Sequence, residues 1–506
     1  MTSTTRFLMI GGILTIACGV FIALFLINRV MTPRAADQMI TSEEESPPQG
    51  ETDFTERADR AREMTAEGSS TRTDSAVPLL GSGSVGITTL EPLNIQSLGL
   101  GRYPNVRETY TDPVFGTSLL RFTDATDRND YANHDYSQLQ AFSADSEYII
   151  VNEADGTTVR RVADGSRATL EPFRGNTVRW HLGIPHTLFF FDSNEDTTIR
   201  AQTANVDTGE IREAFIFPDR YDRIRVNQSF DEMSEDGRWV TGMAAMSDDD
   251  DMIFALDLTR GEITVEISLS LLYRTVCEED PDYGILEPDW VSPSPLGNYL
   301  VVNWARDGAE RCSGQEVYDI RTGRYLGHSY DGRQHGDLAV HPDGSEIFVT
   351  DIPSPIGDGL PAIGYYTLPD GVETPTFIRS MPWHGIWHIS CRGPRGVCAI
   401  TSFDPEPDWD LRRVLDSEIY LLYFDGAVRR LTHHRSSGCG YWVQPRATIS
   451  GDGRYIAFDS DYNLELGGPN SCATVDPELG GGEVFLILLP EAAKYSPGGA
   501  SRTFDL

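Results

Sequence analysis

The sequence predicts an all-β protein, a seven-bladed β-propeller closed by an N-terminal strand and preceded by one transmembrane helix and a disordered stalk. Two independent repeats predict the propeller. The first has small or apolar residues, then S-x-D-G, then an aromatic or β-branched strand. Its clear and weaker copies lie at 141–151, 183–191, 232–242, 291–302, 339–349, 391–400 and 448–458. The second is a turn that ends in glycine, at Gly165, Gly209, Gly261, Gly323, Gly371 and Gly426. These glycines are 44 to 62 residues apart, a length that suits the four short strands of one propeller blade.

The first 30 residues predict a membrane anchor. Leu8–Ile27 is an uncharged apolar stretch of 20 residues, long enough to cross a bilayer as a helix. Cys18 faintly matches a lipoprotein processing site, but the apolar run continues well beyond it. We therefore expect an uncleaved helix in the inner membrane. The flanking arginines are too evenly divided to fix its orientation.

Residues 31–95 are acidic, polar and poor in large apolar side chains, which predicts a flexible stalk. The propeller is expected at 96–490, followed by a tail at 491–506. Its seventh blade has no outer strand of its own after 483–490, whereas 115–124 resembles an outer strand found elsewhere in the repeat. We expect this N-terminal strand to close the ring, which protects open strand edges. An open two-sheet sandwich is the structural alternative.

The cysteines indicate an oxidising compartment. Outside the anchor they fall into three neighbouring pairs: Cys277 with Cys312, Cys391 with Cys398, and Cys439 with Cys472. Local pairing of an even number predicts disulfides and places the propeller in the periplasm or outside the cell. The alternative is six unrelated buried thiols. The first pair brackets the longest repeat, so the fourth blade is expected to carry a disulfide-pinned insertion.

Charge and missing motifs exclude several classes of function. The net charge is −36, and such a surface repels phosphate backbones, so no nucleic-acid partner is expected. The sequence has no Walker loop, dinucleotide fingerprint or G-x-S-x-G elbow. The acidic run at 247–251 lacks the alternation of a calcium loop and predicts a solvated turn.

The repeat unit resembles that of TolB-like (PD40/WD40-like) propellers. Two longer stretches, 111–148 and 431–463, are similar to propeller-type polysaccharide lyases, namely the oligogalacturonate lyases and the ulvan-lyase-like propellers. The resemblance implies cleavage of uronate-containing glycans by β-elimination, in some members with Mn²⁺ held by histidines and a glutamine. This chain keeps Gln444 but has Arg446 where those oligogalacturonate lyases have a histidine. Ulvan-lyase-like chemistry, which uses His, Tyr and Arg without a catalytic metal, is less affected.

Seven of the ten histidines lie just upstream of an S-x-D-G turn, where inner strands converge on the channel. β-Elimination needs a cation to neutralise the uronate carboxylate, a base for the C5 proton and an acid for the leaving oxygen. We assign Arg446 as neutraliser, His134 as base, and Tyr136 or Tyr441 as acid. The residues expected to bind substrate are His181, His335, Trp383, His384, His388, His434, Trp442 and Gln444. If a Mn²⁺ or Ca²⁺ ion is present, its expected ligands are His335, His388 and Gln444.

The same residues have a structural interpretation. Propeller histidines often bridge inner strands through hydrogen bonds, and the tryptophans would then pack between blades. Two functions therefore stay open: a glycan-active propeller that acts on an acidic polysaccharide, or a non-catalytic TolB-like propeller that binds protein partners in the cell envelope. Fold alone does not choose between them.

Overall fold

The computed structural model describes residues 86–95, 104–125, 131–173, 178–193, 198–225, 233–278, 286–306, 308–330, 336–369, 374–404, 413–437, 443–462 and 482–489. The predicted anchor, the stalk up to residue 85 and the C-terminal tail lie outside these ranges. Within the ranges, no helix reaches the length and hydropathy needed to cross a bilayer.

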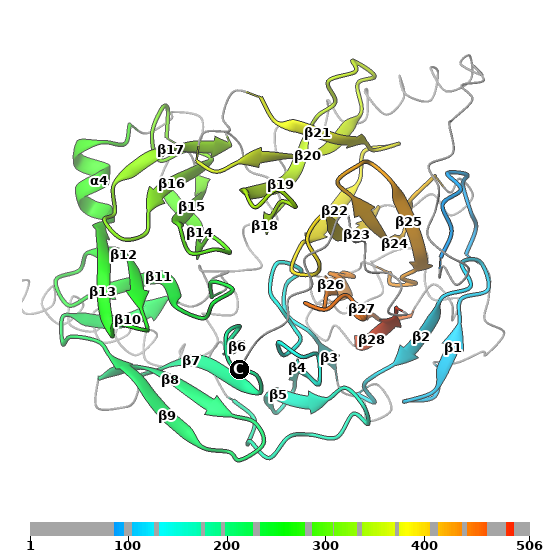
Figure 1. Cartoon of the computed structure of the whole chain (residues 1–506), viewed down its shortest axis with the longest axis horizontal. Coiled ribbons are helices and arrows are strands. Elements are labelled where there is room, and N and C mark those ends of the chain that lie inside the picture. Colours follow the sequence, from blue (N-terminus) through cyan, green and yellow to red (C-terminus); the bar gives the residue numbers. More distant parts are fainter. Residues whose placement is uncertain are drawn as a thin grey trace, which may run out of the picture. The chain divides into compact units, whose positions relative to one another are not determined.

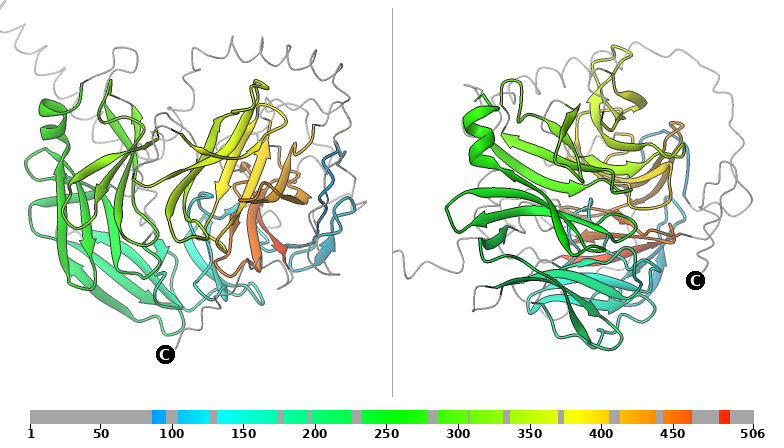
Figure 2. Two further views of the ribbon diagram at one scale, coloured as in Figure 1. Left: turned by 45° about the horizontal axis from the view of Figure 1, so that its top comes forward. Right: turned by 60° about the vertical axis from the view of Figure 1, so that its left-hand side comes forward.

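Seven antiparallel sheets follow one another along the chain and stand around a common centre (Figures 1 and 2). Blade 1 has β3 (Ala132–Asn133), β4 (Tyr148–Glu153) and β5 (Gly156–Arg161). Blade 2 has β6 (Val178–Trp180), β7 (Thr187–Ser193), β8 (Ile199–Asn205) and β9 (Ile211–Ile216). Blade 3 has β10 (Tyr221–Arg225), β11 (Trp239–Met246), β12 (Asp251–Asp257) and β13 (Glu262–Ser268), followed by helix α4 (Leu269–Thr275).

The remaining blades have the same order, from the inner strand outward. Blade 4 has β14 (Glu287–Pro293), β15 (Tyr299–Arg306), β16 (Gln315–Asp319) and β17 (Tyr325–Tyr330). Blade 5 has β18 (Gly336–Val340), β19 (Glu346–Pro353), β20 (Pro361–Thr367) and β21 (Thr376–Ser380). Blade 6 has β22 (Ile386–Ser390), β23 (Val397–Phe403), β24 (Glu418–Tyr423) and β25 (Val428–His433). Blade 7 has β26 (Thr448–Ile449), β27 (Tyr455–Ser460) and β28 (Glu483–Leu488).

The N-terminal strand closes the ring, as the sequence predicts. β2 (Ser118–Arg121) pairs antiparallel with β28, from Ser118 opposite Leu488 to Arg121 opposite Phe485. β1 (Thr109–Thr111) adds a further strand outside β2. The first and last parts of the propeller therefore share one sheet.

The apolar core lies between the blades. In the described residues, each of seven hydrophobic clusters draws its side chains from two consecutive blades. The cluster that joins the last blade to the first contains Leu120, Ala457 and Phe142. Because every blade buries both faces against a neighbour, the sheets form a closed ring rather than an open sandwich.

The repeat motif builds the turn between the two inner strands of a blade. The hydroxyl of Ser234 donates to Asp236 (2.6 Å) and accepts the backbone N–H of Trp239 (2.9 Å). Ser143 and Ser450 make the same pair of bonds. The glycine of the motif has a positive φ, 70° at Gly237, which favours a residue without Cβ.

Two predicted disulfides are confirmed. Cys277 pairs with Cys312 beside blade 4, and Cys391 pairs with Cys398 across the turn between β22 and β23. The third predicted pair, Cys439 with Cys472, lies outside the described residues.

Candidate functional site

A bulge of blade 1 crosses the central channel. Asn133 pairs with Asn152, and the next bridge joins Phe142 to Ile149, so residues 134–141 lie opposite only two residues of β4. The amide of Gln138 donates to the carbonyl of Gly336 in blade 5. On the ring, blade 5 is three blades away from blade 1, and the bulge therefore spans its centre.

Contacts with blades 6 and 7 hold the bulge in place. The Nε of Arg392 donates to the carbonyl of Gln138 (2.7 Å), and the hydroxyl of Thr448 donates to that of Leu139 (2.9 Å). The same guanidinium pairs with buried Asp337 of blade 5 at 3.0 Å. The bulge thus brings the sequence-predicted residues of blade 1 next to those of blades 6 and 7.

His134 is fully buried between blades 1 and 7. Its Nδ1 lies 2.9 Å from a carboxylate oxygen of Asp459 on β27, and its Nε2 hydrogen-bonds the carbonyl of Arg446. The backbone N–H of His134 also donates to Asp459 (3.0 Å). Since a carbonyl oxygen only accepts, the Nε2–H donates to it, and the Nδ1 faces the Asp459 carboxylate.

The Asp459 carboxyl is equally isolated from water. Burial raises its pKa, while the charges of His134 and Arg446 and the hydrogen bonds from His134 act in the opposite direction. Both ring nitrogens of His134 face protein oxygens, so neither is left for a substrate. This geometry favours a positioning role for His134 over its assignment as base.

Four of the predicted residues meet beside this pair. The guanidinium of Arg446 lies over the ring of Tyr136, with its carbon 5.3 Å from the ring centroid. The ring of His388 meets the same tyrosine edge-on at 5.3 Å, and its Nε2 donates to the amide oxygen of Gln444 (3.1 Å). Tyr136, His388 and Arg446 are buried, whereas Gln444 is half-buried. We call Tyr136, His388, Gln444 and Arg446 the Tyr136–Arg446 group.

The other predicted residues lie elsewhere or outside the described ranges. His181 occupies the position of the repeat serine at the turn of blade 2, packs against Gly237 of blade 3 and has a pKa lowered by burial. Trp383 donates to the carbonyl of Val414 (2.8 Å) and packs against Trp387. His384 is half-buried, and buried His434 accepts the N–H of Ser436. The structure does not describe His335, Tyr441 or Trp442.

Two of the three expected metal ligands lie close together, and the third, His335, lies outside the described residues. They are His388 and Gln444, whose Nε2 and amide oxygen are 3.1 Å apart.

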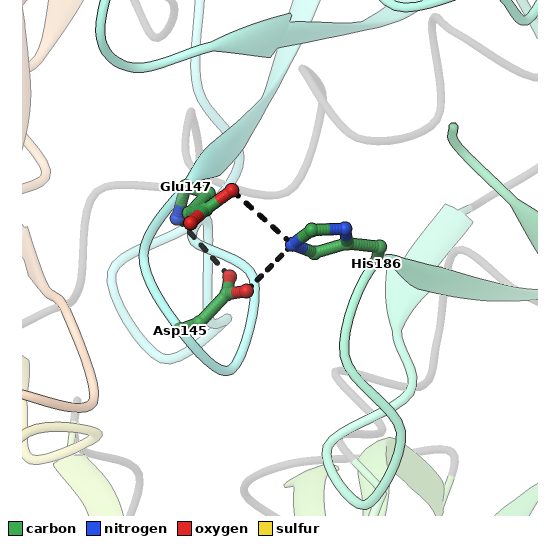
Figure 3. A group of neighbouring side chains, drawn as sticks. All are labelled: Asp145, Glu147 and His186. Atoms are coloured by element: carbon green, nitrogen blue, oxygen red, sulfur yellow. Dashed lines mark hydrogen bonds and ion pairs between the residues drawn. The ribbon is translucent and has the colours of Figure 1, made fainter.

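One group at the junction of blades 1 and 2 was missed in the sequence (Figure 3). In the described part of the chain, three side chains of types that can bind a metal ion lie close together here: Asp145, Glu147 and His186. The Nε2 of His186 lies 2.6 Å from Asp145 and 3.5 Å from Glu147, and its Nδ1 lies 2.6 Å from Asp207. Burial lowers the His186 pKa, but the bonds and charges of Asp207 and Asp145 outweigh burial and raise it. We interpret the group as an ion-pair bridge between two blades.

Comparisons with known proteins bear on the fold alone. No protein-family profile and no curated protein sequence matches the chain. An oligogalacturonate lyase from Vibrio parahaemolyticus is similar in structure over 76% of this chain and 97% of that chain, with a TM-score of 0.52 and 11% identity. The chain shares its propeller fold.

Two further solved structures are more distant. The match to TolB from Acinetobacter baumannii covers 57% of this chain and 61% of the TolB chain, with a TM-score of 0.32 and 12% identity. The match to the β-propeller domain of the trilobed protease from Pyrococcus furiosus covers 65% of this chain and 91% of that domain's chain, with a TM-score of 0.36 and 12% identity.

Proposed function

We propose that this chain is a membrane-anchored, extracytoplasmic propeller that binds a uronate-containing glycan at the Tyr136–Arg446 group and cleaves it by β-elimination. The observation that carries the proposal is the packing of the Arg446 guanidinium on the Tyr136 ring, next to half-buried Gln444. β-Elimination on a bound uronate requires a cation, a proton-transfer group and a neutral hydrogen-bonding group such as an amide. An oligogalacturonate lyase shares the propeller fold, so the fold is compatible with this substrate class but does not select it.

Each residue of the group has one role in the proposed reaction. Arg446 pairs with the uronate carboxylate and makes the C5 proton more acidic. Tyr136, as the tyrosinate, accepts that proton, the electron pair of the C5–H bond forms the C4=C5 double bond, and the C4–O bond breaks with its electron pair left on the oxygen. The leaving oxygen takes a proton from an acid, for which Tyr441 stays the prediction. Gln444 and His388 orient the sugar, and no metal takes part.

His134 and Asp459 act indirectly in this scheme. The bond from His134 to the Arg446 carbonyl fixes the backbone that carries both Arg446 and Gln444. The pair is therefore proposed to position the cation, in the way that a second layer of residues orients a reactive group. The two disulfides support an oxidising compartment for the propeller.

The test is turnover and binding on a panel of uronate polysaccharides. The full chain is incubated with each glycan, with and without Mn²⁺ or Ca²⁺, and the ultraviolet absorbance of the unsaturated product is followed. The same glycans are titrated to measure binding. We expect elimination with one uronate class, without added metal, and its loss in Arg446→Ala. An exposed arginine, changed in Arg212→Ala, provides the control.

The second candidate is a non-catalytic propeller that binds envelope proteins. The specific observation in its favour is the burial of Tyr136, His388 and Arg446, which leaves Gln444 as the more exposed member of the group. Binding without elimination would support a glycan-binding propeller. If no glycan of the panel is bound or cleaved, that result contradicts the first proposal and favours this one.

A further inference from the structure

Residues 86–93 lie along the outer edge of blade 6. The N–H of Ile87 donates to the carbonyl of Arg430 (3.0 Å), and the N–H of Arg430 donates back to the carbonyl of Ile87 (2.8 Å). This segment, in blue beside the orange strand β25 in Figure 1, comes from the end of the stretch expected to be a stalk. All six residues of β25 are buried, whereas β9 and β13, the outer strands of blades 2 and 3, expose side chains.

Arg430 binds the segment through its backbone carbonyls. Its Nη1 donates to the carbonyls of Thr89 (2.6 Å) and Glu91 (2.8 Å). Its Nε and Nη2 donate to the two oxygens of Glu418 at 2.7 and 2.5 Å. One planar guanidinium thus uses its fixed fork to join the segment to β24. Both side chains are inaccessible to solvent.

His433 adds a second contact from the same strand. Its Nε2 donates to the carbonyl of Leu93 (3.2 Å) and lies 3.8 Å from Glu418. The ring of Phe115 packs edge-on against His433, with centroids 4.9 Å apart, and lies under Arg430. Glu418 is therefore the anion on which both contacts with the segment converge.

The start of the segment is specific for glycine. Gly86 has a φ of 86°, and a Cβ added there would lie 2.4 Å from the carbonyl oxygen of Arg430. Any other residue would have both an unfavourable backbone conformation and a clash with β25. A random stretch of linker that merely touched the propeller would not need this fit.

We propose that residues 86–93 form a strap that fastens the N-terminal part of the chain to the outer edge of blade 6. The strap adds a strand-like segment to β25 and is fixed by Arg430 and His433 on Glu418. It covers an edge that would otherwise offer unpaired backbone groups to another chain. The connection to the N-terminal part therefore leaves the propeller at one defined blade. This inference does not depend on the proposed activity.

Hydrogen–deuterium exchange on the full chain tests the strap. Gly86→Val acts on the strap without changing a side chain of blade 6. Gly451→Val is the matched control, because a Cβ there meets nothing within 4 Å. We expect amide exchange at 87–93 to rise about tenfold or more in Gly86→Val, while β23 and β24 keep their protection. The control should leave exchange at 87–93 unchanged.

A second variant approaches the same contact from blade 6. Arg430→Gln removes the bonds to Thr89 and Glu91 and should also raise exchange at 87–93. Its effect is compared with that of Gly86→Val, since loss of the buried pair with Glu418 destabilises blade 6 itself. Unchanged exchange at 87–93 in Gly86→Val would overturn the proposal, as would simultaneous loss of protection throughout blade 6 in that variant.

Discussion

The contact between His134 and Asp459 is buried beside the Tyr136–Arg446 group. Its two side chains are almost inaccessible to solvent, and it joins blade 1 to the strand β27 of blade 7. Removing one partner of such a buried polar pair destabilises a protein, because the other partner stays behind in a medium of low dielectric. The same pair also fixes the carbonyl of Arg446, so stability and site geometry are linked here.

His134→Ala should therefore destabilise the protein. We expect a loss of about 3 kcal/mol or more in the free energy of unfolding, because Asp459 is left buried without its histidine. Urea denaturation followed by tryptophan fluorescence measures it. His341→Ala removes a partly exposed pair with Asp343 and should cost less than about 1 kcal/mol. Equal, small losses in the two variants would remove the case for a structural role of His134.

The His186 bridge predicts a dependence of stability on pH. The groups that face it are Asp145, Glu147, Asp207 and the ring of Tyr148. Since the folded-state pKa of His186 is raised, its contribution is complete below the unfolded pKa of about 6.5 and is lost as pH rises through the folded value.

The variant for this test is His186→Asn, because asparagine tolerates the φ of 52° at this position. We expect the difference in unfolding free energy between wild type and variant to be larger at about pH 6 than at about pH 9. A difference that is constant across this range, or that grows with pH, would contradict the bridge.

At the scale of single elements, some turns of the repeat require glycine for two reasons, the backbone conformation and the packing against a neighbouring blade. Gly297 and Gly209 both have positive φ, at 70° and 73°. A Cβ at Gly297 would lie 2.4 Å from a ring carbon of Trp239 in the neighbouring blade, whereas a Cβ at Gly209 would meet nothing within 4 Å. The two sites therefore separate backbone strain from packing.

Gly209→Ala should cost about 1–2 kcal/mol through backbone strain alone. Gly297→Ala should cost about 1–3 kcal/mol more, because the added methyl group also displaces Trp239. Chemical denaturation of both variants measures the difference. If the two losses are equal, the turn of blade 4 is not packed against blade 3 as described.

The elements show why the fold was easier to predict than the site. A blade is a local unit, so its strands and turns repeat along the sequence, and the closing strand near Leu119 could be identified by its likeness to other outer strands. The bulge at 134–141 and the pairing of His134 with Asp459 depend on contacts between residues that are far apart in the chain. The bridge at His186 joins the turns of two blades for the same reason. Such contacts leave no periodic signal, and sequence position alone grouped His181 with residues from which the fold separates it.

At the scale of the whole molecule, stability depends on ring closure. Glu483 at the start of β28 accepts hydrogen bonds from Arg121 (2.5 Å), Thr123 and the backbone of Ala125 (3.1 Å). All three donors lie at the C-terminal end of the closing strand β2 or just after it, and Glu483 is buried. One carboxylate therefore holds together the two parts of the chain that close the propeller.

Glu483→Gln should lower the free energy of unfolding by about 3 kcal/mol or more, since it removes the carboxylate charge that faces buried Arg121. Because every blade shares its core with both neighbours, the whole ring should unfold in one transition. Coincident denaturation curves from fluorescence and circular dichroism would agree with this expectation. Separate melting of blade 7, or unchanged stability, would contradict closure through Glu483.

In the proposed reaction, Tyr136, held against Arg446, transfers the proton in glycan elimination. The most direct measurement compares Tyr136→Phe with wild type on the glycan that the panel identifies, using the rate of unsaturated product formation and the affinity for the same glycan. The phenylalanine keeps the packing on Arg446 and His388 and removes only the hydroxyl. Tyr365→Phe, in blade 5, is the matched control. We expect the rate to fall by about a hundredfold or more in Tyr136→Phe, with affinity little changed and the control active. An unchanged rate in Tyr136→Phe would contradict this role.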